Sequence, residues 1–331
     1  MYFHQVSRLK TIKTGELDIT AVSHRLQFWL LLSFTVPSLI CSLIIIYRYL
    51  STRTIRHAFH HHSILLIIFT NVLIILTDVS WMMDNHRRLG QVWSSTSTFC
   101  LIWWLLDDSL YSIQTGIIAW ASIERHIIIF HSGYFATSRQ RLIYHYLPPI
   151  LIIIYLFGFY FVVLLLIPCQ NIYFFDEIEC GSSPCYLEIN ILSIWDTIVN
   201  SFIPTLLIAI FNITLFYRII AQKQRLRQPI QWKKHRRMSI QLLSLSGVYL
   251  FLNLPLTIIY FLEAINKFDS SVGYTEQLLI FLMTYGVTLS LPFVVFLNRL
   301  TLDRHRNLRV SPIVTVIHAK RTTANEVSTV G

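Results

Sequence analysis

Apolar residues are gathered into seven long runs that are separated by short polar segments. A helix needs about 20 predominantly apolar residues to cross the hydrocarbon core of a bilayer, and each run has roughly that length. The pattern therefore predicts an all-α fold, a bundle of seven transmembrane helices. The runs cover Leu26–Tyr49, Ser63–Asp84, Thr98–Phe130, Tyr146–Pro168, Ile191–Ile220, Met238–Leu262 and Gln277–Leu297.

The third run differs from the others because Asp107 and Asp108 lie inside it. Without this run the bundle would have six spans. The segments Cys100–Trp104 and Ile117–Ile129 are strongly apolar on either side of the two acids. We therefore include it as a span.

Composition supports a membrane location. Hydrophobic residues make up 54% of the 331 residues, and charged residues make up only 13%, about half the usual share for a soluble domain. Such a chain has too few polar side chains to cover a water-exposed surface. In lipid, every backbone N–H and C=O must be paired internally, which again favours helices.

Positive charge is divided unevenly between the two sides of the predicted bundle. The N-terminus and the loops after the second, fourth and sixth runs contain only seven of the 27 Lys and Arg residues. Loops rich in Lys and Arg face the cytoplasm, so we expect the N-terminus outside and the C-terminus inside. The net charge of +10 then reflects topology and contact with anionic lipid, not a nucleic-acid partner.

These features predict one domain with two short extensions. Residues 1–25 are expected to form a short extracellular N-terminus, and residues 26–298 the seven-helix domain. Residues 299–331 would be a cytoplasmic tail with room for a short amphipathic helix. The first 25 residues contain no apolar stretch of signal-peptide length, so the first run should act as its own insertion signal.

Four of the five cysteines fall on the predicted outer side. They are Cys100, Cys169, Cys180 and Cys185, whereas Cys41 lies inside the first run. An oxidising exterior favours disulfides. Four cysteines allow three pairings, which the residues alone leave open.

The third run is marked at both ends. Cys100 opens it, and the triplet Glu124–Arg125–His126 closes it. These features resemble the rhodopsin-like (class A) family of G-protein-coupled receptors, which has a Cys and an acid–Arg–Tyr triplet at these places. The family's usual separation of 25 residues from Cys to Arg is met by Cys100 and Arg125.

Three prolines extend the resemblance to the later runs. Pro204 stands in NSFIPTLLIAIFN of the fifth run, Pro255 in YLFLNLP of the sixth, and Pro292 in SLPFVVF of the seventh. Each proline removes a backbone hydrogen bond from its helix. By resemblance, these prolines are the expected helix hinges.

Several positions depart from the family's pattern. Asn71 stands where the family usually has a sodium-binding Asp, and Asn253 stands where it has a Trp in the sixth helix. Leu291 replaces the Asn before Pro292, and Val295 and Phe296 occupy the place of the Tyr that follows it. The chain is thus similar to a divergent, orphan branch of the family.

The resemblance implies a multi-pass receptor of the plasma membrane that passes an extracellular signal to a heterotrimeric G protein. It implies no catalytic residue, cofactor or metal. In this reading Glu124 holds Arg125 in the resting state, and a freed Arg125 contacts the G protein. His126 completes the triplet.

The resemblance also places a ligand pocket. Asp107 lies seven residues after Cys100, where monoamine receptors carry their ammonium-binding Asp. A carboxylate in an apolar pocket binds cations, and aromatic faces add cation–π contacts. The ligand is therefore expected to be an amine or a peptide. The candidate pocket residues are Trp103, Trp104, Asp107, Asp108, Tyr111 and Asn253.

For the disulfides we expect Cys100 to pair with Cys185, which lies 19 residues before Pro204. This bridge would tie the third span to the second extracellular loop. Cys169 and Cys180 would then form a second, local bridge. Pairing of Cys100 with Cys180 is the alternative.

Two other classes of protein share single features with this sequence. The segment His57-Ala-Phe-His60-His61-His62 matches one histidine box of the membrane di-iron desaturases, but such an enzyme needs about eight histidines in several boxes. A seven-span transporter or channel would line several spans with charged residues at mid-depth. The first, fourth and sixth runs have no charged residue in their middles.

Overall fold

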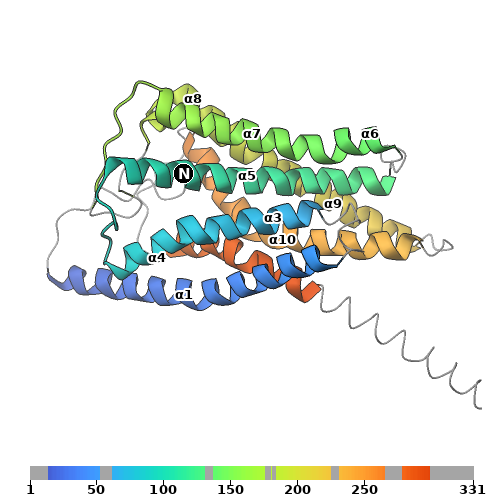
Figure 1. Cartoon of the computed structure of the whole chain (residues 1–331), viewed down its shortest axis with the longest axis horizontal. Coiled ribbons are helices and arrows are strands. Elements are labelled where there is room, and N and C mark those ends of the chain that lie inside the picture. Colours follow the sequence, from blue (N-terminus) through green and yellow to red (C-terminus); the bar gives the residue numbers. More distant parts are fainter. Residues whose placement is uncertain are drawn as a thin grey trace, which may run out of the picture.

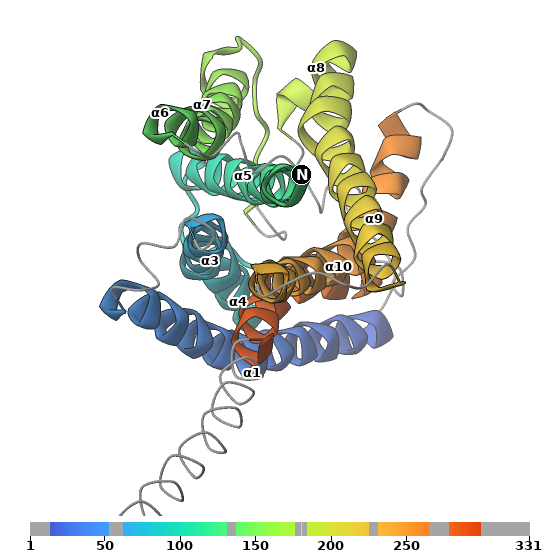
Figure 2. The ribbon, with the colours of Figure 1, turned by 90° about the vertical axis from the view of Figure 1, so that its right-hand side faces the viewer.

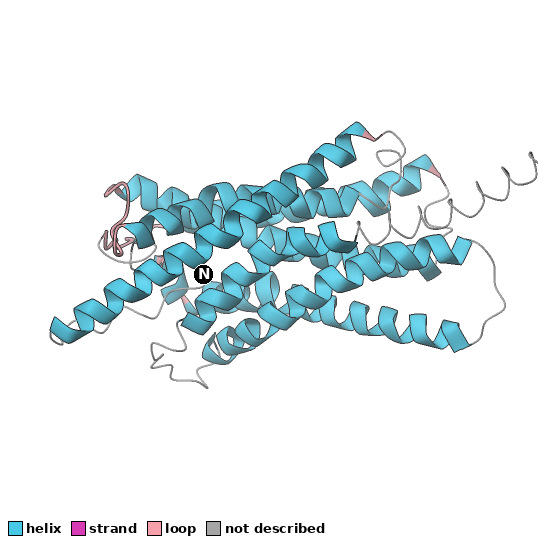
Figure 3. Cartoon of the chain, turned by 90° about the horizontal axis from the view of Figure 1, so that it is seen from below, coloured by secondary structure: helices cyan, strands magenta, loops and turns pink. Residues whose placement is uncertain are grey.

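The computed structural model describes residues 14–52, 62–130, 137–175, 180, 184–224, 231–264 and 278–298. Within these residues the long elements are helices, and no strand is present (Figure 3). Residues 1–13, the tail over 299–331, and the histidines at 57, 60 and 61 lie outside the described residues.

Each of the seven predicted runs coincides, apart from a few end residues, with a helical segment of the described chain, which confirms the predicted all-α bundle. The first is α1 (Thr14–Ser51), and the third is α5 (Ser97–Phe130). The second comprises α3 (His62–Ile74), η2 (Ile75–Val79) and α4 (Ser80–Arg87). The fourth comprises α6 (Ser138–Arg141), η4 (Leu142–Tyr146), α7 (Leu147–Phe161) and η5 (Val162–Leu166). The fifth comprises α8 (Asn190–Trp195), η8 (Asp196–Phe202) and α9 (Ile203–Gln224). The sixth is α10 (Gln231–Ala264), and the last helix is Leu278–Asn298.

The start of the first helix was predicted too late. Helix α1 begins at Thr14, whereas the apolar run begins at Leu26. Apolar residues mark only the part of a helix that can lie in hydrocarbon. A helix can continue into water beyond that part, so hydropathy gives no signal for its true beginning.

Helix α5 is at the centre of the bundle. It packs against α3, α7, α9 and α10, and the view along the bundle shows it enclosed between them (Figure 2). Its two ends lie towards opposite ends of the bundle (Figure 1). We call them the disulfide end, which holds Cys100, and the Arg125 end.

Within the part of the chain that the structure describes, six helical segments are long and apolar enough to cross a membrane. Helix α5 is not among them, and it carries Asp107, Asp108, Glu124 and Arg125. All four side chains are buried. Because its neighbours shield these groups, α5 can carry four ionisable side chains within a membrane bundle.

Glycine permits the close approach of α5 and α7. A Cβ atom at Gly116 would lie only 2.7 Å from Cγ2 of Ile152. Small residues at such crossings let two helix backbones approach closely, and van der Waals packing is a main attraction between helices in lipid.

The predicted hinge prolines all lie within helices. Pro255 is inside α10, and Pro292 is inside the last helix. Pro204 is the second residue of α9, two positions after the end of the π-helix η8. Proline cannot donate a backbone hydrogen bond and crowds the preceding turn, and π-helical turns are rare and occur mostly as single-turn bulges within α-helices. Whether these prolines act as hinges stays a prediction.

Candidate functional site

Two groups of polar side chains lie on α5, one towards each end. Asp107 and Asp108 are near the disulfide end, and Glu124 and Arg125 are near the other end. From Asp107 to Arg125 there are 18 residues along one helix, or about 27 Å at 1.5 Å per residue. This span is close to the thickness of the hydrocarbon core.

The first group is organised around Asp78, a residue of η2 that sequence reasoning missed. The Trp103 indole N–H donates to Oδ1 of Asp78 at 3.0 Å, and the Tyr111 hydroxyl donates to Oδ2 at 3.1 Å. Both aromatic residues were predicted to line a ligand pocket at Asp107, whereas in the structure their polar atoms form hydrogen bonds with Asp78. The available signal was an acid inside the apolar second run, since ionisable residues within a span are rare and functional.

A second carboxylate, Asp196 of η8, was also missed. It is fully buried and accepts hydrogen bonds from Tyr160 (2.7 Å), Tyr186 (3.1 Å) and Asn200 (2.9 Å). Asp108 of α5 lies close enough to interact with it electrostatically. The two neighbouring acids of the third run therefore face different neighbours, and Asp108 lies on the side of the fourth and fifth spans. Asp107 interacts with Tyr111 instead.

Tyr186 belongs to the loop between the fourth and fifth spans, in the 3₁₀ turn η7 (Cys185–Glu188). Its ring has no exposed surface. Burial and the nearby charges of Asp108 and Asp196 raise the pKa of Tyr186 well above its ordinary value, so its hydroxyl keeps the proton that it donates. A second loop residue, Tyr173, packs against Trp104 with ring centroids 5.0 Å apart. The loop thus binds Asp196 through Tyr186 and contacts the predicted ligand residue Trp104 through Tyr173.

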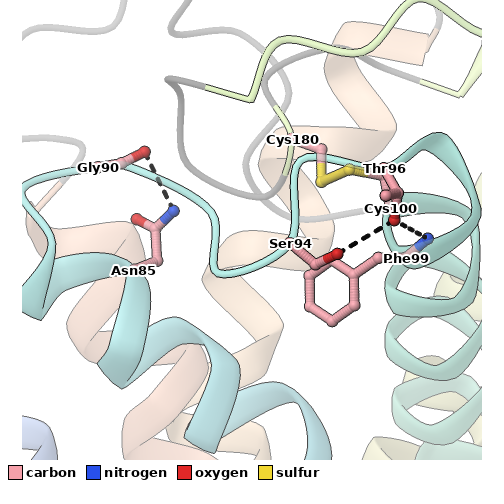
Figure 4. Close-up of a disulfide and its surroundings, with 7 residues drawn as sticks. All are labelled: Asn85, Gly90, Ser94, Thr96, Phe99, Cys100 and Cys180. Carbon is pink, nitrogen blue, oxygen red and sulfur yellow. Dashed lines mark hydrogen bonds between the residues drawn. A yellow bond between two sulfur atoms is a disulfide. The ribbon is translucent and has the colours of Figure 1, made fainter.

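The predicted disulfide pairing is wrong. Cys100 is bonded to Cys180 (Figure 4), and Cys169 is bonded to Cys185. The path of the loop is the reason. The Phe174 N–H donates to the Cys180 carbonyl, and Cys180 has a left-handed φ of 62° beside the start of α5.

Cys185 is held on the other side of the loop. Its N–H donates to Oδ1 of Asn171 at 2.9 Å, two residues after Cys169. The separation of 19 positions from Cys185 to Pro204 predicted that Cys185 could reach Cys100. That count does not show that the loop turns back and places Cys185 beside Asn171 and Cys169.

Asn253 belongs to a chain of hydrogen bonds that connects α10 to α5 through Tyr249. Its amide donates to the Tyr249 hydroxyl at 2.7 Å and to Thr257 at 3.2 Å, all within α10. Tyr249 in turn shares a 2.7 Å hydrogen bond with Thr115 of α5. The structure therefore places Asn253 in a connection between α10 and α5.

At the Arg125 end, Glu124 is held by two other spans. Ser63 of α3 donates to Oε2 of Glu124 at 2.6 Å, and Nδ1 of His145 in η4 contacts Oε1. Arg125 is buried and interacts electrostatically with Glu124. His126 packs edge-on against Phe211 of α9, with centroids 5.5 Å apart. Sequence spacing gave no sign of the Ser63 and His145 contacts.

The histidine box is only partly described. Nδ1 of His62 lies 3.3 Å from Nε2 of His145. Its other three histidines are outside the described residues. Among the side chains that the structure places, no group of three or more His, Cys, Asp or Glu could hold a metal ion.

A comparison with protein families agrees with this geometry. The model of a family described as "7 transmembrane receptor (rhodopsin family)" matches residues 38–294. This range contains every predicted span except part of the first and the end of the last. A search of curated proteins found no match.

Proposed function

The chain belongs to the rhodopsin family of seven-transmembrane receptors, and on this premise we propose that it passes an extracellular amine or peptide signal to a heterotrimeric G protein. Members of the family are receptors that span the membrane several times. The plasma membrane, the ligand class and the coupling to a G protein belong to the proposal. One observation carries it: the single helix α5 joins a buried carboxylate group at the disulfide end to a buried Glu–Arg pair at the other.

The disulfide end supports recognition of a cationic ligand. Asp107 and Asp108 are buried on α5, and Asp196 is buried on the fifth span. A carboxylate in apolar surroundings gains strongly from a cationic partner, because charges interact more strongly where water is excluded. Trp104 and the loop residue Tyr173 present aromatic rings beside this region, and such rings favour ammonium or guanidinium groups.

The Arg125 end supports contact with an effector. Arg125 is 2% exposed and lies next to Glu124. A buried guanidinium is costly unless it is paired. A rearrangement that exposes Arg125 would therefore create a cationic contact point for a partner on that side of the membrane. Side-chain bonds from α5 to α10 (Thr115 to Tyr249) and to α9 (Ser122 to Asn212) provide routes by which a change at α5 can reach neighbouring spans.

The proposal is tested by expressing the chain in cells that carry a panel of G-protein reporters and by screening amines and basic peptides. We expect a cationic compound to raise the response of at least one reporter. Asp107→Asn should weaken that compound, and Asp84→Asn, a change at a partly exposed acid on α4, should not. Coupling by no member of the panel, with the receptor present at the cell surface, would contradict the proposal.

A further inference from the structure

Glu124 is clamped between two spans that flank α5. Ser63 comes from the second span and His145 from the fourth, and each contacts a different oxygen of the carboxylate. Ser63, Glu124 and His145 are all at least nine-tenths buried. The acid that precedes Arg125 therefore has a fixed position that is set from outside α5.

The contact with His145 continues towards the end of the bundle. Nε2 of His145 lies 3.3 Å from Nδ1 of His62, and the Tyr146 hydroxyl lies 3.3 Å from the same His62 nitrogen. Tyr146 is exposed. A chain of hydrogen-bonding groups thus runs from the buried Glu124 to a side chain at the surface of the bundle.

Glu124 has two neighbours that can carry positive charge. Arg125 interacts with it electrostatically, and His145 forms an ion pair with it when the imidazole is protonated. An opposite charge within a few ångströms stabilises a carboxylate, and the buried surroundings strengthen each interaction. A positive charge on His145 would therefore offset part of the negative potential that Glu124 exerts on Arg125.

We propose that His145 is a positioning residue for Glu124, and that the charge on His145 sets how firmly Glu124 holds Arg125. This inference rests on the proposed coupling through Arg125. When His145 is protonated, it neutralises Glu124 and the hold on Arg125 weakens. When His145 is neutral, it still donates to Glu124 from Nδ1, but the full negative charge acts on Arg125.

The sign of the pH effect follows from this competition. Acidification of the Arg125 side adds a proton to the imidazole pair, loosens Arg125 and raises ligand-independent coupling. The titratable and charged groups that face this unit include Glu124 and Arg125 of α5, His62 of α3, Tyr146 of η4 and, beside Arg125, Tyr49 of α1.

The main variant is His145→Asn. The Asn amide nitrogen can take the place of Nδ1 and donate to Glu124, but it cannot become charged. The matched control is His24→Asn, which makes the same change in another histidine pair. His24 and His86 lie at the disulfide end, with their Nδ1 atoms 2.9 Å apart.

The first measurement does not depend on signalling. Purified receptor labelled with ¹⁵N-histidine is titrated by NMR in lipid nanodiscs over the pH range in which the receptor stays folded. The signal of His145, one of 13 histidines, is identified by its loss in His145→Asn. We expect it to show uptake of a proton across this range and to change in Glu124→Gln. A His145 that stays neutral throughout overturns the inference.

The second measurement is ligand-independent nucleotide exchange on G proteins in open membranes, over the same pH range. We expect exchange by the wild type and by His24→Asn to rise several-fold on acidification, and His145→Asn to stay low and flat. If His145→Asn folds poorly, His62→Ala serves instead. It removes the acceptor for a protonated His145, so the rise should move to lower pH.

The outcomes distinguish failure of the role of His145 from failure of the proposed coupling to a G protein. Exchange that is present but equally pH-dependent in wild type and His145→Asn overturns the role of His145 alone. Exchange that is absent in the wild type at every pH overturns the proposed coupling, and the regulation inferred from it falls as well.

Discussion

The indole N–H of Trp103 donates a 3.0 Å hydrogen bond to Asp78, which joins the third span to the second in the buried core of the disulfide end. Trp103 is 1% exposed and Asp78 is 2% exposed. With the Tyr111 hydroxyl as its second donor, Asp78 holds two aromatic side chains of α5 in place. Residues that look like ligand contacts in the sequence thus also fix the position of the central helix.

Asp78→Ala is expected to destabilise the receptor. The change leaves the donors of Trp103 and Tyr111 buried without their acceptor, and each such group costs about 1–3 kcal/mol. Thermal unfolding of purified receptor in detergent should therefore occur at a clearly lower temperature. The control is Asp84→Ala, whose partner Arg88 is 45% exposed, because exposed ion pairs contribute at most about 1 kcal/mol. Equal losses in the two variants would show that the Asp78 hydrogen bonds contribute little.

The disulfides are expected to pair Cys100 with Cys180 and Cys169 with Cys185. Peptide mapping of the unreduced protein should find these two links. Cys100→Ser should cost about 2–5 kcal/mol if the bridge behaves like other native ones, and adding Cys180→Ser should cost little more. A peptide that links Cys100 to Cys185 would contradict the loop path described above.

The spans were predictable because the bilayer imposes a length and a composition that a single sequence displays. The contacts between spans were not. Glu124 and His145 are 21 positions apart, and nothing in their local patterns indicates that η4 places the imidazole on the carboxylate. Likewise, Asp78 and Asp196 are acids within apolar runs. Only the packing of their helices against α5 shows that Asp78 binds Trp103 and Tyr111 and that Asp196 lies near Asp108.

The cysteines show a further limit. Their number and their side of the membrane predicted disulfides, and the resemblance predicted that one would involve Cys100. The partner depended on where the loop turns back, which Asn171 and the left-handed Cys180 decide. Residue counts along a loop do not contain that information.

The N-terminus is expected to be extracellular. An epitope tag before Leu26 should be stained on intact cells, whereas a tag after Gly331 should be stained only after the membrane is made permeable. The reason is the excess of Lys and Arg in the loops on the opposite side. The reverse staining would place Arg125 outside the cell and remove the proposed contact with a G protein.

Asp107→Asn is expected to weaken a cationic ligand without changing ligand-independent coupling. The loss should be about 1–3 kcal/mol, the scale of a hydrogen bond to a charged group, or roughly 5- to 150-fold in Kd. Radioligand binding and a reporter assay without ligand measure the two quantities. Unchanged affinity would indicate that the ligand is held elsewhere, with the loop over Asp196 as the next region to test.

The central claim is that α5 connects a ligand site at one end to an effector site at the other, and Arg125→Ala tests it most directly. A ligand can shift the resting and active states only through unequal affinity for them, and Arg125 is about 27 Å from Asp107 along the helix. The decisive measurement is therefore agonist affinity in the absence of G protein together with agonist-stimulated nucleotide exchange, for the wild type and for Arg125→Ala at equal surface expression. The account predicts that the variant keeps the wild-type affinity and loses the exchange response. Normal exchange by Arg125→Ala with the same agonist would contradict it.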